Sequence, residues 1–177
     1  MVRLRGALCV TLGLAIFGLS GCATSLAGLD FRTDKRLSFI EPHSREQVKL
    51  PVHLAWTMKD FTPAAPGSQP PTKTAGYFAI FVDHTAIKPG QSMRAVAHGD
   101  SFCESNPKCP DRGYLAERQI YTTTATSYVL HNVLPITNND EHVQLHAAVI
   151  VLMDTAGNRI GESSWEIDFR TVNESDT

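Results

Sequence analysis

The sequence lacks several features that mark common classes of protein. Its longest apolar run, residues 7–19, covers about 13 positions, fewer than the roughly 20 that a membrane-spanning helix needs. Lys and Arg number 16 against 18 Asp and Glu, which gives a formal net charge of −2, and no basic stripe stands out. This balance of charge argues against nucleic acid as a partner.

The motifs of frequent catalytic sites are also missing. The chain contains no Gly-x-Ser-x-Gly nucleophile elbow. It has no His-Glu-x-x-His zinc motif and no glycine-rich phosphate loop after a strand. Ser, His and Asp are plentiful, so a catalytic triad chosen by eye has no value. We therefore predict a protein that is not an enzyme and that carries no cofactor.

The first 21 residues have the composition of a secretory signal. Arg3 and Arg5 precede the apolar run and small residues follow it, which is the order of a basic region, an apolar region and a cleavage site. The run ends in Leu-Ser-Gly-Cys at residues 19–22. These four residues resemble the lipobox of bacterial lipoproteins. In that family the cysteine receives a diacylglyceryl group, the bond before it is cut and the new amine is acylated.

The resemblance implies that Cys22 is the lipidated first residue of the mature chain and that its lipid holds the protein to a membrane. Stable anchoring takes more than one acyl chain, and the lipoprotein modification supplies several. Ala23 follows the cysteine, at the position where enteric lipoproteins kept in the inner membrane commonly carry Asp. We therefore expect anchoring to the outer membrane, facing the periplasm, and a protein partner in the envelope.

The rest of the chain predicts strands rather than helices. Apolar and other residues alternate with the period of a strand in four segments, residues 48–58, 77–82, 143–153 and 165–170. Two weaker β-forming segments cover residues 37–40 and 119–130. No long amphipathic helix stands out. Many short strands with turn signals between them favour a two-layer sandwich.

Three segments resemble strands of a fibronectin type III domain. VKLPVHLAWTM is similar to its B strand with the core tryptophan, TSYVLHNVLP to its E strand, and VQLHAAVIVLMDTAGNRIGESSWEIDFRT to its F and G strands. Bacterial immunoglobulin-like domains match equally well. The resemblance implies an all-β, immunoglobulin-like or fibronectin type III-like sandwich of about seven antiparallel strands. The predicted parts are a signal peptide (1–21), a tether (22–35), the sandwich (36–172) and a C-terminal tail (173–177).

Cys103 and Cys109 are the only cysteines that remain once Cys9 leaves with the signal and Cys22 takes the lipid. We predict a disulfide between them, because the compartment is oxidising and an Asn-Pro pair between them favours a turn. A zinc site needs more ligands, and a redox motif favours a two-residue spacing. Both remain weaker alternatives.

The segment around this pair is the candidate recognition surface. Residues 84–118 form a long stretch without a strand pattern, and loops of that length are usually functional or disordered. A disulfide within this stretch favours an ordered segment over a disordered one. The residues that we expect to contact a partner are Phe102, Glu104, Asn106, Lys108, Asp111, Arg112 and Tyr114. A stapled insertion without any partner is an equal alternative.

Seven histidines keep a second hypothesis open, that of a periplasmic metal-binding protein or enzyme. His142 and His146 share one face of a predicted strand but lie about 13 Å apart at a rise of about 3.3 Å per residue, too far for one ion. His53 lies beside His146 on an outer face if their strands pair. His84 and His98 flank the long segment. We name no metal ligand, and the favoured prediction is a lipid-anchored binding or assembly module.

Overall fold

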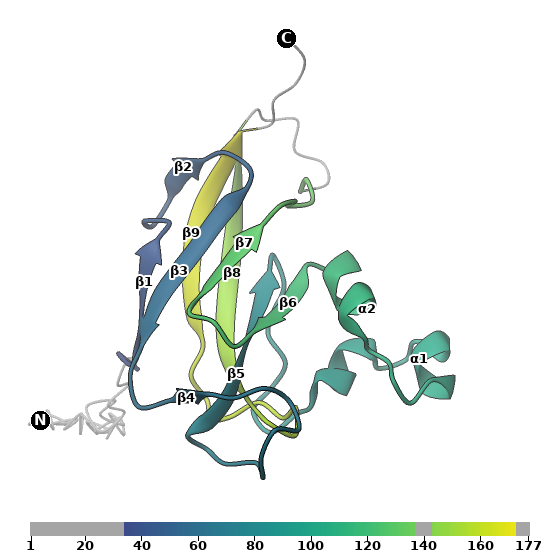
Figure 1. The fold of residues 1–177 in the computed structure, drawn as a ribbon. Helices are drawn as coiled ribbons and strands as arrows, with labels where there is room; N and C mark the ends of the chain where they lie inside the picture. The colour runs from purple at the N-terminus through teal and green to yellow at the C-terminus, as the bar shows by residue number, and fades with distance from the viewer. Residues whose placement is uncertain (1–33, 137–142, 173–177) are drawn as a thin grey trace, which may run out of the picture. The chain divides into compact units, whose positions relative to one another are not determined.

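The computed structural model describes residues 34–136 and 143–172, and these residues form two β-sheets (Figure 1). The predicted signal peptide, Cys22, His142 and the predicted tail lie outside the described residues. The first sheet is antiparallel with the strand order β1-β3-β7. Its strands are β1 (Leu37–Glu41), β3 (Val52–Met58) and β7 (Ser127–Leu130).

The second sheet has the order β2-β9-β8-β5-β4, and β6 also pairs with β5. The long strands β5, β8 and β9 are antiparallel to their neighbours, whereas β2 pairs parallel with β9 and β4 pairs parallel with β5. The strands are β2 (Glu46–Val48), β4 (Thr62–Pro63), β5 (Ala75–Val82), β6 (Ile120–Thr123), β8 (Val143–Asp154) and β9 (Trp165–Val172).

This arrangement confirms the predicted all-β sandwich. In an immunoglobulin-like sandwich the first, second and fifth strands share one sheet, and the third, sixth and seventh share the other. The corresponding sets here are β1, β3 and β7 in one sheet and β5, β8 and β9 in the other. The described residues hold nine strands rather than about seven, because β2 and β4 are short parallel additions to the second sheet.

The core between the sheets follows from alternation along the strands. In β3, Val52, Leu54 and Trp56 turn inward and are each at most 1 % exposed. Trp56 meets Phe78 of β5 edge to face, with ring centroids 5.2 Å apart, a geometry that aromatic pairs prefer. The ladder of β3 begins directly after Pro51, because proline has no N–H to donate.

The weak segment 119–130 is two strands rather than one. β6 pairs with β5 in the second sheet and β7 pairs with β3 in the first, so the chain crosses between sheets at residues 124–126. Tyr121 of β6 and Tyr128 of β7 meet across this crossing, with ring centroids 5.0 Å apart. Because β6 pairs with β5 alone among the described residues, its other edge is free.

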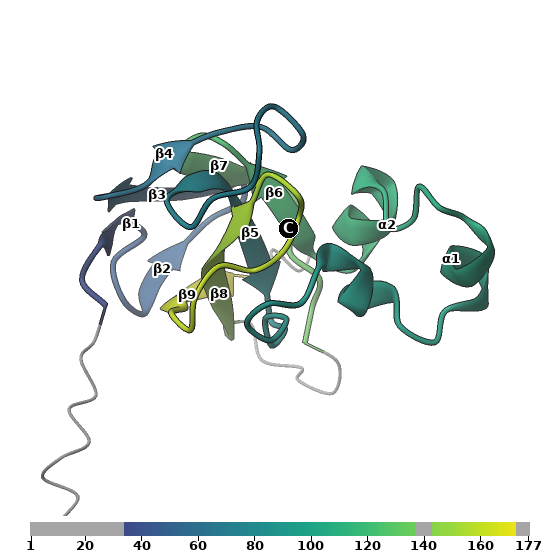
Figure 2. The same ribbon diagram turned by 90° about the horizontal axis from the view of Figure 1, so that it is seen from below.

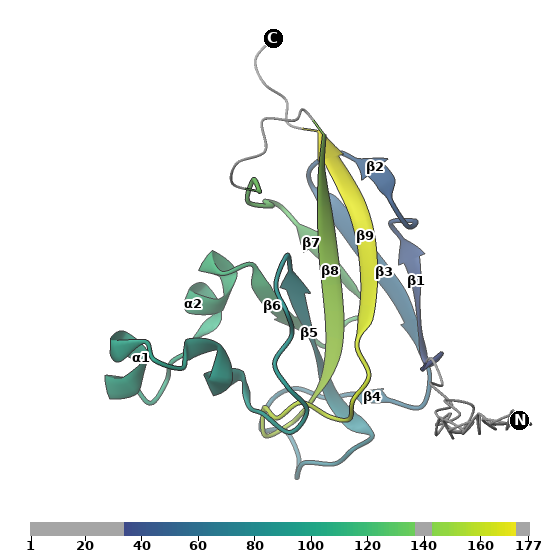
Figure 3. The same ribbon diagram turned by 180° about the vertical axis from the view of Figure 1, so that it is seen from behind.

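The region between β5 and β6 holds three short helices instead of the predicted irregular stretch. They are the 3-10 helix η2 (Met93–Ala97), α1 (Ser101–Ser105) and α2 (Arg112–Glu117). Five or six residues are too few to show a helical period in the sequence. The helices lie beside β5 and β6, away from the first sheet (Figures 2 and 3). There Met93 and Leu115 pack with Phe81 and Val151 in a second apolar cluster.

The predicted outer position of His146 on β8 is wrong. Gln144 and His146 lie inside and are each 2 % exposed, whereas Leu145, on the opposite face, is 46 % exposed. The histidine tolerates burial because both ring nitrogens have partners within the protein. His53 does not lie beside it, because β3 and β8 belong to different sheets.

Candidate functional site

The candidate site begins with a stapled segment, defined here as residues 100–118, which carries α1 and α2. Asp100 caps α1 by accepting hydrogen bonds from the N–H groups of Phe102 and Cys103, at 3.0 and 3.4 Å. Asp111 caps α2 in the same way, accepting from the N–H of Tyr114 at 2.9 Å. Such caps satisfy N–H groups that have no partner within the helix, which is how two very short helices hold their form.

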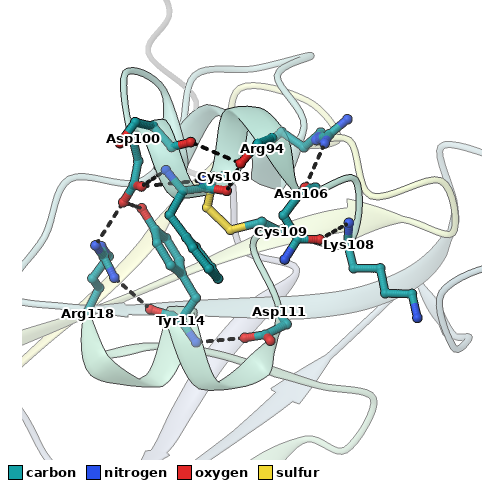
Figure 4. The surroundings of a disulfide bond; sticks show 12 residues. Arg94, Asp100, Cys103, Asn106, Lys108, Cys109, Asp111, Tyr114 and Arg118 are labelled. Atoms are coloured by element: carbon teal, nitrogen blue, oxygen red, sulfur yellow. Dashed lines mark hydrogen bonds and ion pairs between the residues drawn. A yellow bond between two sulfur atoms is a disulfide. The ribbon is translucent and has the colours of Figure 1, made fainter.

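The disulfide confirms the predicted pairing of Cys103 with Cys109 and joins α1 to the approach to α2 (Figure 4). The two Cα atoms are 5.0 Å apart, within the range that a disulfide spans. Both cysteines are buried, at 6 % and 4 % exposure, and pack with Ala97 and Tyr114 in a small cluster of their own. The disulfide therefore lies within a small apolar cluster.

Asp100, Tyr114 and Arg118 tie the two helices together. The Tyr114 hydroxyl donates to Asp100 Oδ2 at 2.8 Å, and Arg118 Nη2 donates to the same oxygen at 3.4 Å. The Arg118 guanidinium also lies over the Tyr114 ring, 3.5 Å from its centroid, in a cation–π contact. The hydrogen bond from Tyr114, with help from the α1 N–H groups and Arg118, lowers the pKa of Asp100.

The seven predicted contact residues divide into two groups. Asn106, Asp111 and Tyr114 serve the segment itself: Asn106 Oδ1 accepts from the N–H of Lys108 at 3.0 Å, and the other two act as described above. The remaining four point to solvent without a side-chain partner among the described residues. They are Phe102, which is 64 % exposed, Glu104, Lys108 and Arg112.

A cleft of about 830 Å³ opens between α2, β6 and the proline-rich loop that follows β4, within the size range of ligand sites. We name it the tyrosine cleft, because Tyr77, Tyr121 and Tyr128 line it together with Pro66 and Arg112. Of the predicted contact residues, Asp111 and Arg112 reach this cleft. Sequence reasoning missed the three tyrosines because they come from β5, β6 and β7 and meet only in the folded chain.

The polar groups of the tyrosine cleft are largely unused by the protein. Within the described part of the chain, none of the three tyrosine hydroxyls makes a hydrogen bond, and the Arg112 guanidinium has no ion pair. Tyr77 is only 5 % exposed. Its burial, with the charge of Asp154, raises the pKa of Tyr77 to about 12. Burial also raises the pKa of Tyr121 and Tyr128, so all three remain hydrogen-bond donors at neutral pH.

A second cleft, of about 800 Å³, lies on another side of the helical region. His84 and His98 both line it, together with Arg118 and apolar residues. These are the two histidines that flank the long segment in the sequence. Among residues 34–136 and 143–172, no group of three or more His, Cys, Asp or Glu side chains is placed to hold a metal ion.

A buried histidine network was also missed by the sequence analysis. His146 Nδ1 donates to Asp83 Oδ2 at 2.7 Å, and His146 Nε2 lies 3.0 Å from the Thr171 hydroxyl. This aspartate–histidine–hydroxyl order is the one used in nucleophilic catalysis. The histidine side chain is 1 % exposed and Thr171 is 5 % exposed, so no substrate reaches the hydroxyl in this conformation. The network is structural here.

Comparison of the chain with protein-family models, with curated proteins and with solved structures gives no match. The helices of the described part are all too short or too polar to cross a lipid bilayer.

Proposed function

We propose that the protein is a non-catalytic binding or assembly module that a lipid on Cys22 holds to the outer membrane, facing the periplasm. The anchor rests on the lipobox resemblance at residues 19–22. A disulfide between Cys103 and Cys109 is in keeping with an oxidising compartment. Confinement to a membrane raises the effective concentration of the module near an envelope partner, so that weak contacts are sufficient.

The observation that carries the proposal is the stapled segment. It presents Phe102, 64 % exposed, together with the charged side chains of Glu104 and Lys108, on a backbone fixed by two caps and a disulfide. Large exposed aromatic side chains are frequent anchors of protein interfaces. A backbone that is already ordered loses little conformational entropy on binding, which favours affinity.

Site-specific crosslinking tests the contact surface. A photoreactive phenylalanine analogue replaces Phe102 in the full chain expressed in its native envelope, and the matched control places the analogue at Thr57, which is exposed on β3 of the first sheet. We expect one reproducible crosslinked protein from position 102 and none in common with position 57. The same scattered neighbours at both positions would overturn the assignment of the surface.

A second experiment tests the anchor separately. Cys22→Ala removes the only side chain in the lipobox that forms a thioether with diacylglycerol. We expect the wild-type chain to incorporate labelled palmitate and to sediment with outer-membrane vesicles, and the variant to do neither. An unmodified, uncut wild-type N-terminus in intact-mass spectrometry would contradict the lipoprotein assignment.

A further inference from the structure

We propose that β6 is a docking strand for an extended peptide that carries an acidic side chain, and that this peptide lies in the tyrosine cleft as an added strand of the second sheet. The inference rests on the proposed function, because it names the chemistry of a protein partner and the place where it binds. It adds a binding site centred on β6, outside the exposed residues of the stapled segment.

The first observation is the direction of the main-chain groups of β6. The N–H of Val82 donates to the carbonyl of Gln119 at 3.0 Å, and the antiparallel register continues from Phe81↔Ile120 to Phe78↔Thr123. Antiparallel partners alternate between hydrogen-bonded and non-bonded pairs. Tyr121 and Thr123 therefore direct their N–H and C=O groups to β5, and Ile120 and Thr122 direct theirs to the free edge.

Thr122 is the residue that a ligand reaches first at this edge. Ile120 is 5 % exposed and lies next to α2, whereas Thr122 is half-buried. In the described part of the chain, no hydrogen bond reaches the main chain of Thr122 from the side away from β5. An edge with unused N–H and C=O groups is the template on which extended peptides add a strand.

The second observation is that the cleft follows this edge and has aromatic walls on both of its sides. Alternation places Ile120 and Thr122 on the face of the sheet that holds Tyr77, and Tyr121 on the face toward the first sheet, beside Tyr128. All five residues line the tyrosine cleft. A peptide added along β6 alternates its own side chains between these two walls.

The third observation is the set of polar groups that have no protein partner. Tyr77 as a whole residue is only 5 % exposed. Its hydroxyl makes no hydrogen bond within the described residues and remains accessible to solvent from the cleft. The hydroxyl is therefore open to a hydrogen-bonding group of a ligand in the cleft. Arg112 lines the cleft without an ion pair among the described residues, and Asp111, the other charged residue of the lining, accepts the N–H of Tyr114 in capping α2.

These features favour a peptide over the other possible occupants. A glycan stacks on aromatic rings but has no main-chain ladder to pair with Thr122. A second copy of β6 pairs edge to edge, but it brings a second Arg112 together with a second Asp111 and therefore adds no net negative charge for Arg112. An acidic extended peptide supplies both a main chain that pairs with Thr122 and a carboxylate that pairs with the Arg112 guanidinium.

The test uses the full chain purified in detergent and a library of random heptapeptides displayed on phage. We expect selected peptides to be enriched in Asp or Glu at one position and to lack proline at alternate positions. The strongest peptide is then synthesised with and without N-methyl groups on alternate amides, and binding is measured by fluorescence polarisation. Blocking the ladder in this way should weaken binding at least tenfold. This arm needs no protein variant, so misfolding does not affect it.

Protein variants locate the site. Thr122→Pro removes the outward N–H at an edge, where proline is tolerated, and should weaken binding at least tenfold with an unchanged circular dichroism spectrum. Arg112→Gln should weaken binding about two- to fivefold, the size of an exposed ion pair. Lys59→Gln is the matched control, because Lys59 is exposed just after β3, outside both the tyrosine cleft and the stapled segment, and should leave binding unchanged.

The inference is overturned if N-methylated and unmodified peptides bind equally, if oligosaccharides alone bind, or if light scattering shows a dimer that Thr122→Pro dissociates. Its failure is distinguishable from failure of the proposed function. A crosslink from Phe102 that is insensitive to Thr122→Pro supports a partner on the stapled segment and removes the docking strand. Peptide binding without any crosslink from Phe102 supports the docking strand and removes the stapled segment as the contact surface.

Discussion

Removal of the Asp83 carboxylate tests whether the buried histidine network stabilises the fold. Asp83 Oδ2 accepts from His146 Nδ1 at 2.7 Å, and Oδ1 accepts from the N–H of Ala147 at 2.9 Å. Water does not readily replace the carboxylate at His146, whose side chain is 1 % exposed. Leaving one buried polar group unpaired costs about 1–3 kcal/mol, and we expect the free energy of unfolding to fall by that amount.

The choice of substitution follows from the backbone. Asp83 has a φ of 57°, in the left-handed region where alanine would add strain and glycine does not. Asp83→Gly therefore removes the carboxylate alone. Asp60→Gly is the matched control, because Asp60 has a φ of 54°, is exposed and accepts no hydrogen bond from any described residue. We expect the control to change the free energy of unfolding by no more than about 0.5 kcal/mol.

Urea denaturation followed by tryptophan fluorescence measures both variants, because Trp56 and Trp165 are buried in the core. An unchanged denaturant slope would indicate that only stability has changed. If the two variants are equally stable to within about 0.5 kcal/mol, the His146 ring has found another partner and the reasoning is refuted.

Three further predictions concern other parts of the domain. Cys103→Ser should lower the free energy of unfolding by up to about 2–3 kcal/mol in urea, and a reductant should have the same effect on the wild type but none on the variant. Asp34 accepts hydrogen bonds from Arg36 and Ser163, and these bonds, that from the Arg36 side chain most strongly, lower the pKa of Asp34 from 3.8 to about 2. Its stabilisation is therefore present above pH 3.8 and lost as the pH falls through 2. In Asp34→Asn, the fall in the free energy of unfolding between pH 5 and pH 2 should be about 1 kcal/mol smaller than in the wild type. Thermal unfolding across this pH range measures the difference. Gly76→Ala should prevent folding or cost more than about 3 kcal/mol, seen as lost near-ultraviolet circular dichroism, because a Cβ at this position overlaps the Met153 carbonyl of the adjacent strand.

The strands were predictable because their signal is local. β3 alternates Val52, Leu54 and Trp56 with residues that face outward, and it lies within the predicted segment 48–58. β8 and β9 likewise lie at the predicted positions. A period of two needs no knowledge of the partner strand. Two layers then follow, because each strand has an apolar face to bury.

The alternation of β8 (Val143–Asp154) predicts an end that is covered on both sides, but it does not predict which face of the first half is buried. Its second half is apolar on both sides, because Ile150 and Leu152 face the first sheet while Val151 and Met153 lie under the helical region. Its first half places the polar His146 inside and Leu145 outside. Alternation fixes which residues share a face but not which face is buried. That choice depends on partners distant in the sequence, here Asp83 and Thr171.

The candidate site was predictable only in part. The spacing of Cys103 and Cys109 and the expected compartment were enough to predict the disulfide, and the length of the segment marked it as unusual. The helices within it are held by caps and by the Asp100–Tyr114–Arg118 contacts rather than by a hydrophobic period. Asp100 and Asp111 are visible in the sequence as cap residues, but five or six residues show no hydrophobic period that would identify the helices.

By itself the sequence determined the strand content, the two-layer class and the paired cysteines, because each depends on neighbours along the chain. Only the tertiary structure decided which face of β8 is buried, that β6 ends the second sheet with a free edge, and that Tyr77, Tyr121 and Tyr128 share one cleft. These outcomes depend on packing between segments tens of residues apart, where the burial of apolar surface and the pairing of polar groups are settled for the whole domain at once.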